Sequence, residues 1–185
     1  MKKRILPLLT VISFSLFNIA CSQSQVSEFK PEDLGKKENI VQQITAEDIN
    51  TIIEHKEYTA LFFYTTWCGA SIENLETHIK NTLDTLDLDD EELSIAIIGL
   101  AKNKNQIEEL TKKYDINYTT YYLNSPIGSG IDKSVINKTL KKIFNDYESK
   151  NSVPIGLLCN NKKEILLPPA GYIFNNIIEA YYRQK

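Results

Sequence analysis

Residues 59–71 read Thr59-Ala-Leu-Phe-Phe-Tyr-Thr-Thr-Trp-Cys-Gly-Ala-Ser71. The first seven form a continuous apolar and aromatic run, which is too short for a helix and suits a strand covered on both faces. After Ala70, apolar residues recur at intervals of three and four, at Ile72, Leu75, Ile79, Leu83 and Leu86. The stretch therefore predicts a buried central strand, a Trp-Cys-Gly turn and a helix that starts at about residue 70.

Strand and helix patterns alternate on both sides of this stretch. Thr45 and Asp48 fit a capping box for a helix over residues 46–56. Downstream we expect strands at 93–100 and 118–123, a helix at 106–114, a long helix carrying residues 135–147, a hairpin over 154–167 that is stopped by Pro168, Pro169 and Gly171, and a closing helix over 173–182. This order predicts the α/β class, as a three-layer α/β/α sandwich with a mixed sheet.

Composition agrees with one soluble globular domain. The chain has 185 residues, of which 42% are apolar, with 21 Lys+Arg against 24 Asp+Glu. Neither sign of charge forms a long block, so we do not expect binding to nucleic acid. Outside the first twenty residues, no apolar stretch approaches the roughly 20 residues that span a bilayer.

The amino terminus reads as an export signal. Residues 1–4 are Met-Lys-Lys-Arg, and residues 5–19 form an apolar core of the expected length. The sequence around Cys21 resembles the lipobox of bacterial lipoproteins, which implies that Cys21 becomes lipidated. Asn18 stands where that family usually has Leu, so simple secretion with a free Cys21 is the alternative.

The predicted organisation is a signal peptide at 1–20, lipid attachment and a tether at 21–43, and a folded domain at 44–185. Removal of residues 1–20 leaves 18 Lys+Arg against 24 Asp+Glu, so acidic lipid should not attract the domain. We expect the protein to lie in the bacterial cell envelope, facing the periplasm. Disulfides persist there, but after Cys21 only Cys68 and Cys159 remain, which is too few for a disulfide framework.

The segment 62–71 resembles the active-site segment of the thioredoxin superfamily. The order of the following elements is similar over residues 44–185, and the inserted strand and helix at 118–150 resemble exported thioredoxin-like thiol-disulfide proteins. The resemblance implies that Pro154 is a cis proline beside Cys68. It also implies that the backbone of Val153 pairs with a bound peptide and that Trp67 covers one side of the sulfur.

Cys68 is the candidate nucleophile. A cysteine at the start of a helix faces unpaired backbone N–H groups, which favour the thiolate that attacks disulfides. The family's second cysteine falls on Ser71, which can donate a hydrogen bond to the thiolate but cannot form a disulfide. An internal dithiol cycle is therefore excluded. Phe62 stands where thioredoxins keep a buried acid.

Cys159 does not replace the missing partner. It lies five residues beyond Pro154, or about 16 Å along an extended strand, whereas a disulfide needs Cα atoms within about 7 Å. We interpret Cys159 as a buried core residue. His55 and His78 are isolated, so we expect no metal site, and no cofactor is implied.

Two functions remain open from the sequence. One is monothiol thiol-disulfide exchange on exported cysteine-containing proteins, with a redox partner protein or an external thiol that releases the adduct and with Cys21 in the lipid bilayer. The other is a redox-inactive lipoprotein that uses the same fold as a binding or accessory module.

Overall fold

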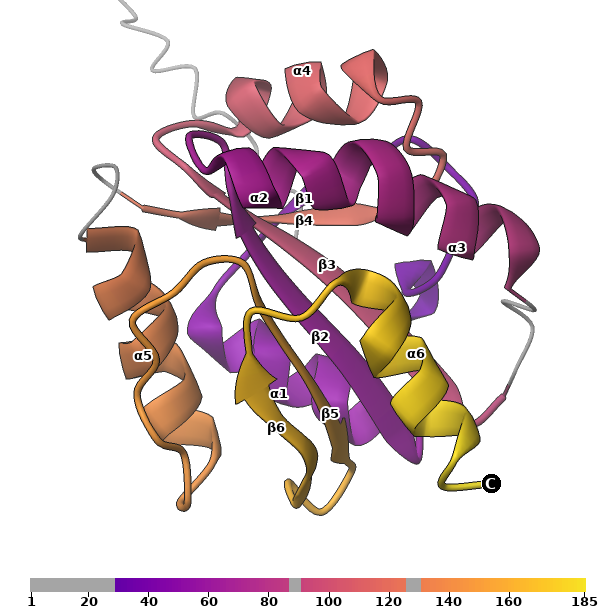
Figure 1. The fold of residues 1–185 in the computed structure, drawn as a ribbon, viewed down its shortest axis with the longest axis vertical. Coiled ribbons are helices and arrows are strands. Elements are labelled where there is room, and N and C mark those ends of the chain that lie inside the picture. Colours follow the sequence, from indigo (N-terminus) through magenta and orange to yellow (C-terminus); the bar gives the residue numbers. More distant parts are fainter. Residues whose placement is uncertain (1–28, 87–90, 126–130) are drawn as a thin grey trace, which may run out of the picture.

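The computed structural model describes residues 29–86, 91–125 and 131–185 (Figure 1). The elements are, in chain order, η1 (Pro31–Asp33), β1 (Val41–Ile44), α1 (Ala46–His55), β2 (Tyr58–Thr65), α2 (Gly69–Glu73), η2 (Asn74–Ile79), α3 (Lys80–Thr85), β3 (Leu93–Ala101), α4 (Lys104–Lys113), β4 (Thr120–Asn124), α5 (Ile131–Ile143), β5 (Ile155–Asn160), β6 (Ile165–Ala170) and α6 (Phe174–Tyr182).

The six strands form one mixed sheet in the order β1-β4-β3-β2-β5-β6. Strands β1, β4, β3 and β2 are parallel, whereas β5 pairs antiparallel with β2 and β6 pairs antiparallel with β5. Seven of the eight residues of β2 are buried. The prediction of a central strand covered on both faces is confirmed.

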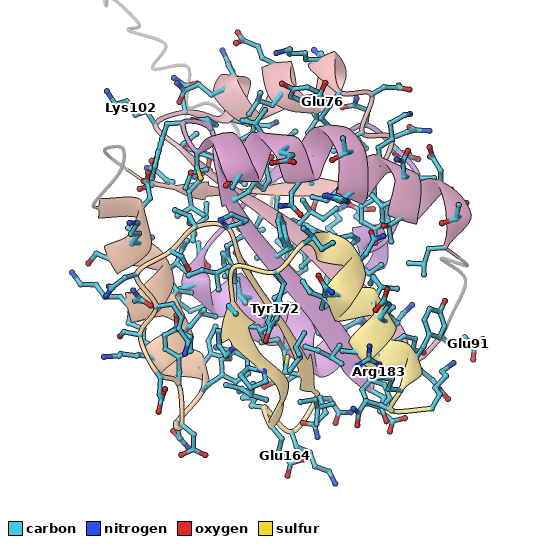
Figure 2. All side chains as sticks on the ribbon, in the orientation of Figure 1. Glu76, Glu91, Lys102, Glu164, Tyr172 and Arg183 are labelled. Carbon is cyan, nitrogen blue, oxygen red and sulfur yellow. The ribbon has the colours of Figure 1, made fainter. Side chains whose placement is uncertain are left out.

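The side chains of β2 alternate between two cores. Phe62 and Tyr64 pack with apolar residues of α2, η2, α3, α4 and α6, while Leu61 and Phe63 pack with those of α1 and α5. Helices therefore cover both faces of the sheet, which confirms the predicted three-layer α/β/α sandwich (Figure 1). Charged side chains such as Glu76, Lys102 and Arg183 point away from the body of the molecule (Figure 2).

The helical segment after Cys68 is continuous through α2, the π-helical turns of η2, and α3. Asn74 is the first residue of η2 and is 5% exposed. Its Nδ2 donates to the carbonyl oxygen of Ala70 (3.0 Å), and its Oδ1 accepts from the backbone N–H of Phe174 (3.0 Å). Asn74 thus caps the amino end of α6 from another element.

The folded unit begins before residue 44, where the sequence placed its boundary. Val41–Ile44 form β1, which pairs with β4 as an edge strand, and Phe29 lies edge-on to Tyr121 with ring centroids 6.0 Å apart. Residues 29–43 therefore do not form only a tether. The strand has four residues, two of them Gln, so it gives too short an apolar pattern to predict.

In the carboxyl-terminal half, two elements, α5 and β6, end at other residues than predicted. β6 continues through Pro168 and Pro169 to Ala170, because an edge strand tolerates residues that lack an N–H donor. α5 ends at Ile143, yet Phe144 and Tyr147 beyond it are still buried. The apolar spacing of this segment thus marked burial correctly but overstated the length of the helix.

The predicted signal peptide and Cys21 lie outside the described residues. Among the residues that are described, no helix has the length and apolar character needed to cross a bilayer.

Candidate active site at Cys68

Cys68 lies between the carboxyl end of β2 and the first residue of α2. Its backbone is extended (φ −89°, ψ 118°), as expected for the residue that caps a helix, and its carbonyl oxygen accepts from the N–H of Ile72 at 3.0 Å. The side chain is partly buried. Cys68 is therefore at the start of a helix, as the sequence predicted, and the residue is partly exposed.

The structure brings Cys68 next to Val153, which is 85 residues away in the chain. The sulfur of Cys68 donates to the carbonyl oxygen of Val153 at 3.3 Å, and the peptide bond between Val153 and Pro154 is cis. Gly171 lies close to this step, because a Cβ atom there would lie 3.6 Å from the carbonyl oxygen of Pro154. The two parts of the site that the resemblance brought together are thus adjacent.

Ser71 is fully buried and faces the end of β2. Its Oγ accepts a hydrogen bond from the backbone N–H of Thr65 at 3.3 Å. Among the hydrogen bonds of the described residues, none joins Ser71 to the sulfur of Cys68. The hydroxyl of Ser71 therefore ties α2 to the central strand.

Trp67 is tied to the inserted strand and helix. The indole is 42% exposed, and its N–H donates to the carboxyl group of Asp132 in the first turn of α5. The other oxygen of Asp132 accepts from the hydroxyl of Ser125, just after β4. Sequence reasoning missed Asp132, because an acidic residue in a first helical turn is also what the helix dipole favours.

Cys159 is remote from Cys68. It pairs with Thr59 near the amino end of β2, whereas Cys68 follows the carboxyl end of the same strand. Both thiols are free, and burial raises the pKa of Cys159 to about 12. The prediction that Cys159 is a buried core residue and not a partner of Cys68 is confirmed.

Phe62, six residues before Cys68, belongs to the apolar core. It is fully buried and packs edge-on against Phe174, with ring centroids 5.8 Å apart. The position at which thioredoxins keep a buried acid is therefore part of the core here, and Phe62 offers no group for proton transfer.

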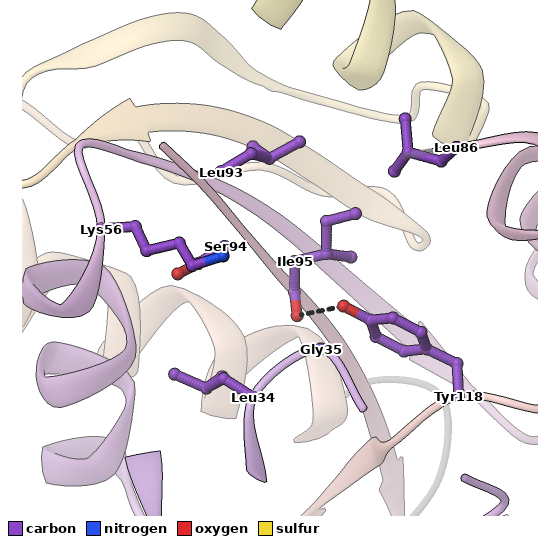
Figure 3. Close-up of a pocket in the computed structure, with 8 residues that line it drawn as sticks. All are labelled: Leu34, Gly35, Lys56, Leu86, Leu93, Ser94, Ile95 and Tyr118. Carbon is purple, nitrogen blue, oxygen red and sulfur yellow. Dashed lines mark hydrogen bonds between the residues drawn. The ribbon is translucent and has the colours of Figure 1, made fainter. Parts of the chain in front are cut away.

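The pocket of Figure 3 lies away from Cys68, at the amino ends of β2 and β3. It is crossed by a hydrogen bond from the Tyr118 hydroxyl to the carbonyl oxygen of Ile95 (3.5 Å), and its cavity volume of about 10 Å³ leaves room for about one water molecule. A groove of about 730 Å³ lies between the end of α5 and β6, and Cys68 is not among its lining residues. The described part of the chain holds no cluster of three or more His, Cys, Asp or Glu side chains suited to a metal ion.

Comparison with protein-family models and with curated proteins gave no match. Among solved structures, the chain is similar to the thioredoxin domain of a thiol-disulfide oxidoreductase from Bacteroides vulgatus (TM-score 0.47, 10% identity, 71% of this chain and 82% of that chain). It is also similar to a thiol:disulfide interchange protein from a Bacteroides species (TM-score 0.46, 10%, 71% and 76%) and to StoA from Bacillus subtilis (TM-score 0.43, 16%, 68% and 82%).

Proposed function

We propose that this protein carries out thiol-disulfide exchange through the single thiol of Cys68, on exported proteins that contain cysteine. The observation that carries the proposal is the position of the Cys68 sulfur, which lies at a helix start, partly exposed and 3.3 Å from the carbonyl oxygen of Val153. A disulfide that approaches along Val153 reaches this sulfur directly.

The proposed reaction balances without a cofactor. The Cys68 thiolate attacks one sulfur of a substrate disulfide, an S–S bond forms between Cys68 and that sulfur, and the second substrate cysteine leaves as a thiolate. A thiolate of the substrate or of an external thiol then attacks the mixed disulfide and restores Cys68. When the substrate's own thiolate does so, its disulfides are rearranged with no net oxidation or reduction.

The arrangement around Cys68 favours this isomerase-type exchange over net reduction. Ser71 cannot resolve the mixed disulfide, and Cys159 lies near the far end of β2. With Cys21 lipidated, the second thiol must therefore come from outside the chain. In the proposal, Cys21 holds the domain at the envelope membrane on its periplasmic side, where such substrates fold.

The peptide that carries the disulfide is proposed to bind between Trp67 and the Val153–Pro154 step. Trp67 and Ile173 are large apolar side chains with 42% and 39% of their surface exposed. Ile173 lies two residues after Gly171, whose backbone is close to Pro154. Exposed apolar side chains of this kind suit an unfolded segment of polypeptide.

A second candidate function is peptide binding without chemistry. The contact that favours it is the one between Ser71 and Thr65, because it gives the position of the second cysteine a structural use. In that case the same groove would bind a partner reversibly, and Cys68 would form no covalent adduct.

Trapping of a mixed disulfide separates the two functions. The mature chain (residues 21–185) with Cys21→Ser is mixed with a peptide that contains one disulfide, and the adduct is quantified by mass spectrometry. We expect one adduct, on Cys68, that forms at least about tenfold faster in the native protein than in urea, where the sulfur has lost its helix start.

Cys68→Ser should abolish the adduct, and Cys159→Ala should leave its rate unchanged. Equal rates in the native and the unfolded chain would contradict the exchange function and favour reversible binding.

A further inference from the structure

Asp132 joins three separate parts of the chain in the buried layer next to the Cys68 turn. It is 2% exposed and accepts hydrogen bonds from the indole N–H of Trp67 and the hydroxyl of Ser125. Ser125 is 1% exposed, and its backbone N–H donates to the carbonyl oxygen of Ala101 at 3.0 Å. The carboxyl group is thus anchored to the ends of β3 and β4.

The two donors explain how an acidic side chain is buried here. A buried carboxyl group is costly unless hydrogen bonds replace those it made with water, and Asp132 has a donor for each oxygen. The first turn of α5 adds the favourable end of the helix dipole. The arrangement fixes Asp132 and makes it a firm attachment point for Trp67.

Trp67 needs such an attachment, because much of its ring is in solvent. With 42% of its surface exposed, packing restrains the indole only in part, and its hydrogen bond to Asp132 is the polar contact that sets its direction. Cys68 is the next residue, so a peptide that reaches the sulfur of Cys68 passes close to this ring.

We propose that Asp132 is a positioning residue for exchange with peptide disulfides: it holds Trp67 in place next to Cys68, whose sulfur contacts the carbonyl oxygen of Val153. The inference rests on the proposed function of Cys68. It assigns to the inserted β4–α5 unit the shaping of the site for extended peptide substrates, as opposed to small disulfides that need no groove.

The test compares the rate of mixed-disulfide formation with a peptide disulfide and with cystamine, in the mature chain with Cys21→Ser. Asp132→Ala removes the acceptor, and Trp67→Phe keeps an aromatic ring without the N–H. Each should slow the peptide reaction about tenfold, the effect expected for loss of one such hydrogen bond, and change the cystamine rate less than twofold.

The double variant should be no slower than either single variant, because both remove the same contact. Asp132→Asn keeps an acceptor oxygen and should stay within about threefold of the parent. Asp146→Ala, an exposed acid of the same unit, is the matched control and should change neither rate. Effects that multiply in the double variant, or an unchanged peptide rate in folded Asp132→Ala, would overturn the proposal.

Trp67 is the single tryptophan of the chain, so its fluorescence tests the contact without any reaction at Cys68. Asp132→Ala should increase acrylamide quenching and lower the emission anisotropy, whereas Asp132→Asn should not. If Asp132→Ala does not fold, Ser125→Ala is used in its place and should give a smaller change in the same direction.

The two readouts separate two kinds of failure. A parent protein that forms no adduct overturns the exchange role together with the proposed function, and its fluorescence still decides whether Asp132 holds Trp67. A parent that reacts, with identical fluorescence in Asp132→Ala, overturns the positioning role alone.

Discussion

Gly99 in β3 shows how closely the residues behind the central sheet are packed. A Cβ atom at Gly99 would lie 2.5 Å from Cδ1 of Ile107 and 2.7 Å from Cζ of Tyr64, and both of these side chains are fully buried. Gly69, the residue after Cys68, has no atom within 4 Å of such a Cβ. A Cβ atom therefore has no room at Gly99 and ample room at Gly69.

Gly99→Ala should lower the free energy of unfolding by about 1–3 kcal/mol, because the added methyl group overpacks the core. Gly69→Ala should change it by no more than about 0.5 kcal/mol, the usual range for an exposed site. Urea denaturation followed by circular dichroism measures both. Alanine normally gains in a strand relative to glycine, so equal or higher stability of Gly99→Ala would show that this space is not limiting.

At this scale the sequence predicts some site residues and not others. Trp67 and Cys68 belong to a local pattern of strand, turn and helix, and Val153 with Pro154 follows from the resemblance. Asp132 lies 65 residues from its partner Trp67, and no spacing rule connects them. The partner of Ser71 was also unexpected, because the burial of its hydroxyl against Thr65 depends on how α2 packs on β2.

Between elements, Asn74 links the helical segment after Cys68 to the carboxyl-terminal helix. Its Oδ1 is the acceptor for the N–H of Phe174, at the first position of α6, where the cap residue Ile173 supplies no side-chain oxygen. Asn81 on α3 makes the same kind of bond to its own helix, from Nδ2 to the carbonyl oxygen of Thr77 (2.7 Å), but is exposed and caps nothing.

Asn74→Ala should therefore lower the free energy of unfolding by about 1–3 kcal/mol, because it leaves a buried N–H without an acceptor. Asn81→Ala should cost no more than about 0.5 kcal/mol. Amide hydrogen exchange gives the local readout, since the N–H of Phe174 should lose protection in the first variant only. If both variants lost the same free energy of unfolding, the loss would come from helix propensity and not from the cap on α6.

Helices and strands could be predicted where the apolar pattern was long. They could not be predicted where tertiary contacts determine whether a segment forms a strand. The capping box of α1 is present as expected, with Thr45 and Asp48 bonded reciprocally. Strand β1 has only four residues and is stabilised by its pairing with β4. No local sequence pattern reveals this pairing. β6 passes through two prolines because it has a neighbour on one side only.

For the whole molecule, the buried run of β2 was sufficient to predict a layered sheet, because a strand that is apolar on both faces must be covered twice. The same burial surrounds several groups that titrate at high pH. Burial raises the pKa of Tyr64, Tyr118 and Tyr121, and raises that of Cys159 from 9.0 to about 12. The Cys159 thiol donates to the carbonyl oxygen of Thr59 at 3.7 Å, which a thiolate could not do.

These shifts predict how the fold responds to alkali. The unfolded chain ionises Cys159 above pH 9, whereas the folded chain keeps it protonated up to about pH 12, so its contribution is complete below pH 9 and is lost as the pH rises toward 12. Between pH 9 and 10 this group should lower the free energy of unfolding by up to about 1.4 kcal/mol, and the buried tyrosines, which ionise near pH 10 in the unfolded chain, add to the fall. Urea titrations at pH 7, 9 and 10 measure the fall. Cys159→Ala should be less stable than the parent at pH 7 but should lose less between pH 9 and 10. Parallel curves for the parent and Cys159→Ala would show that water reaches this sulfur in the folded protein.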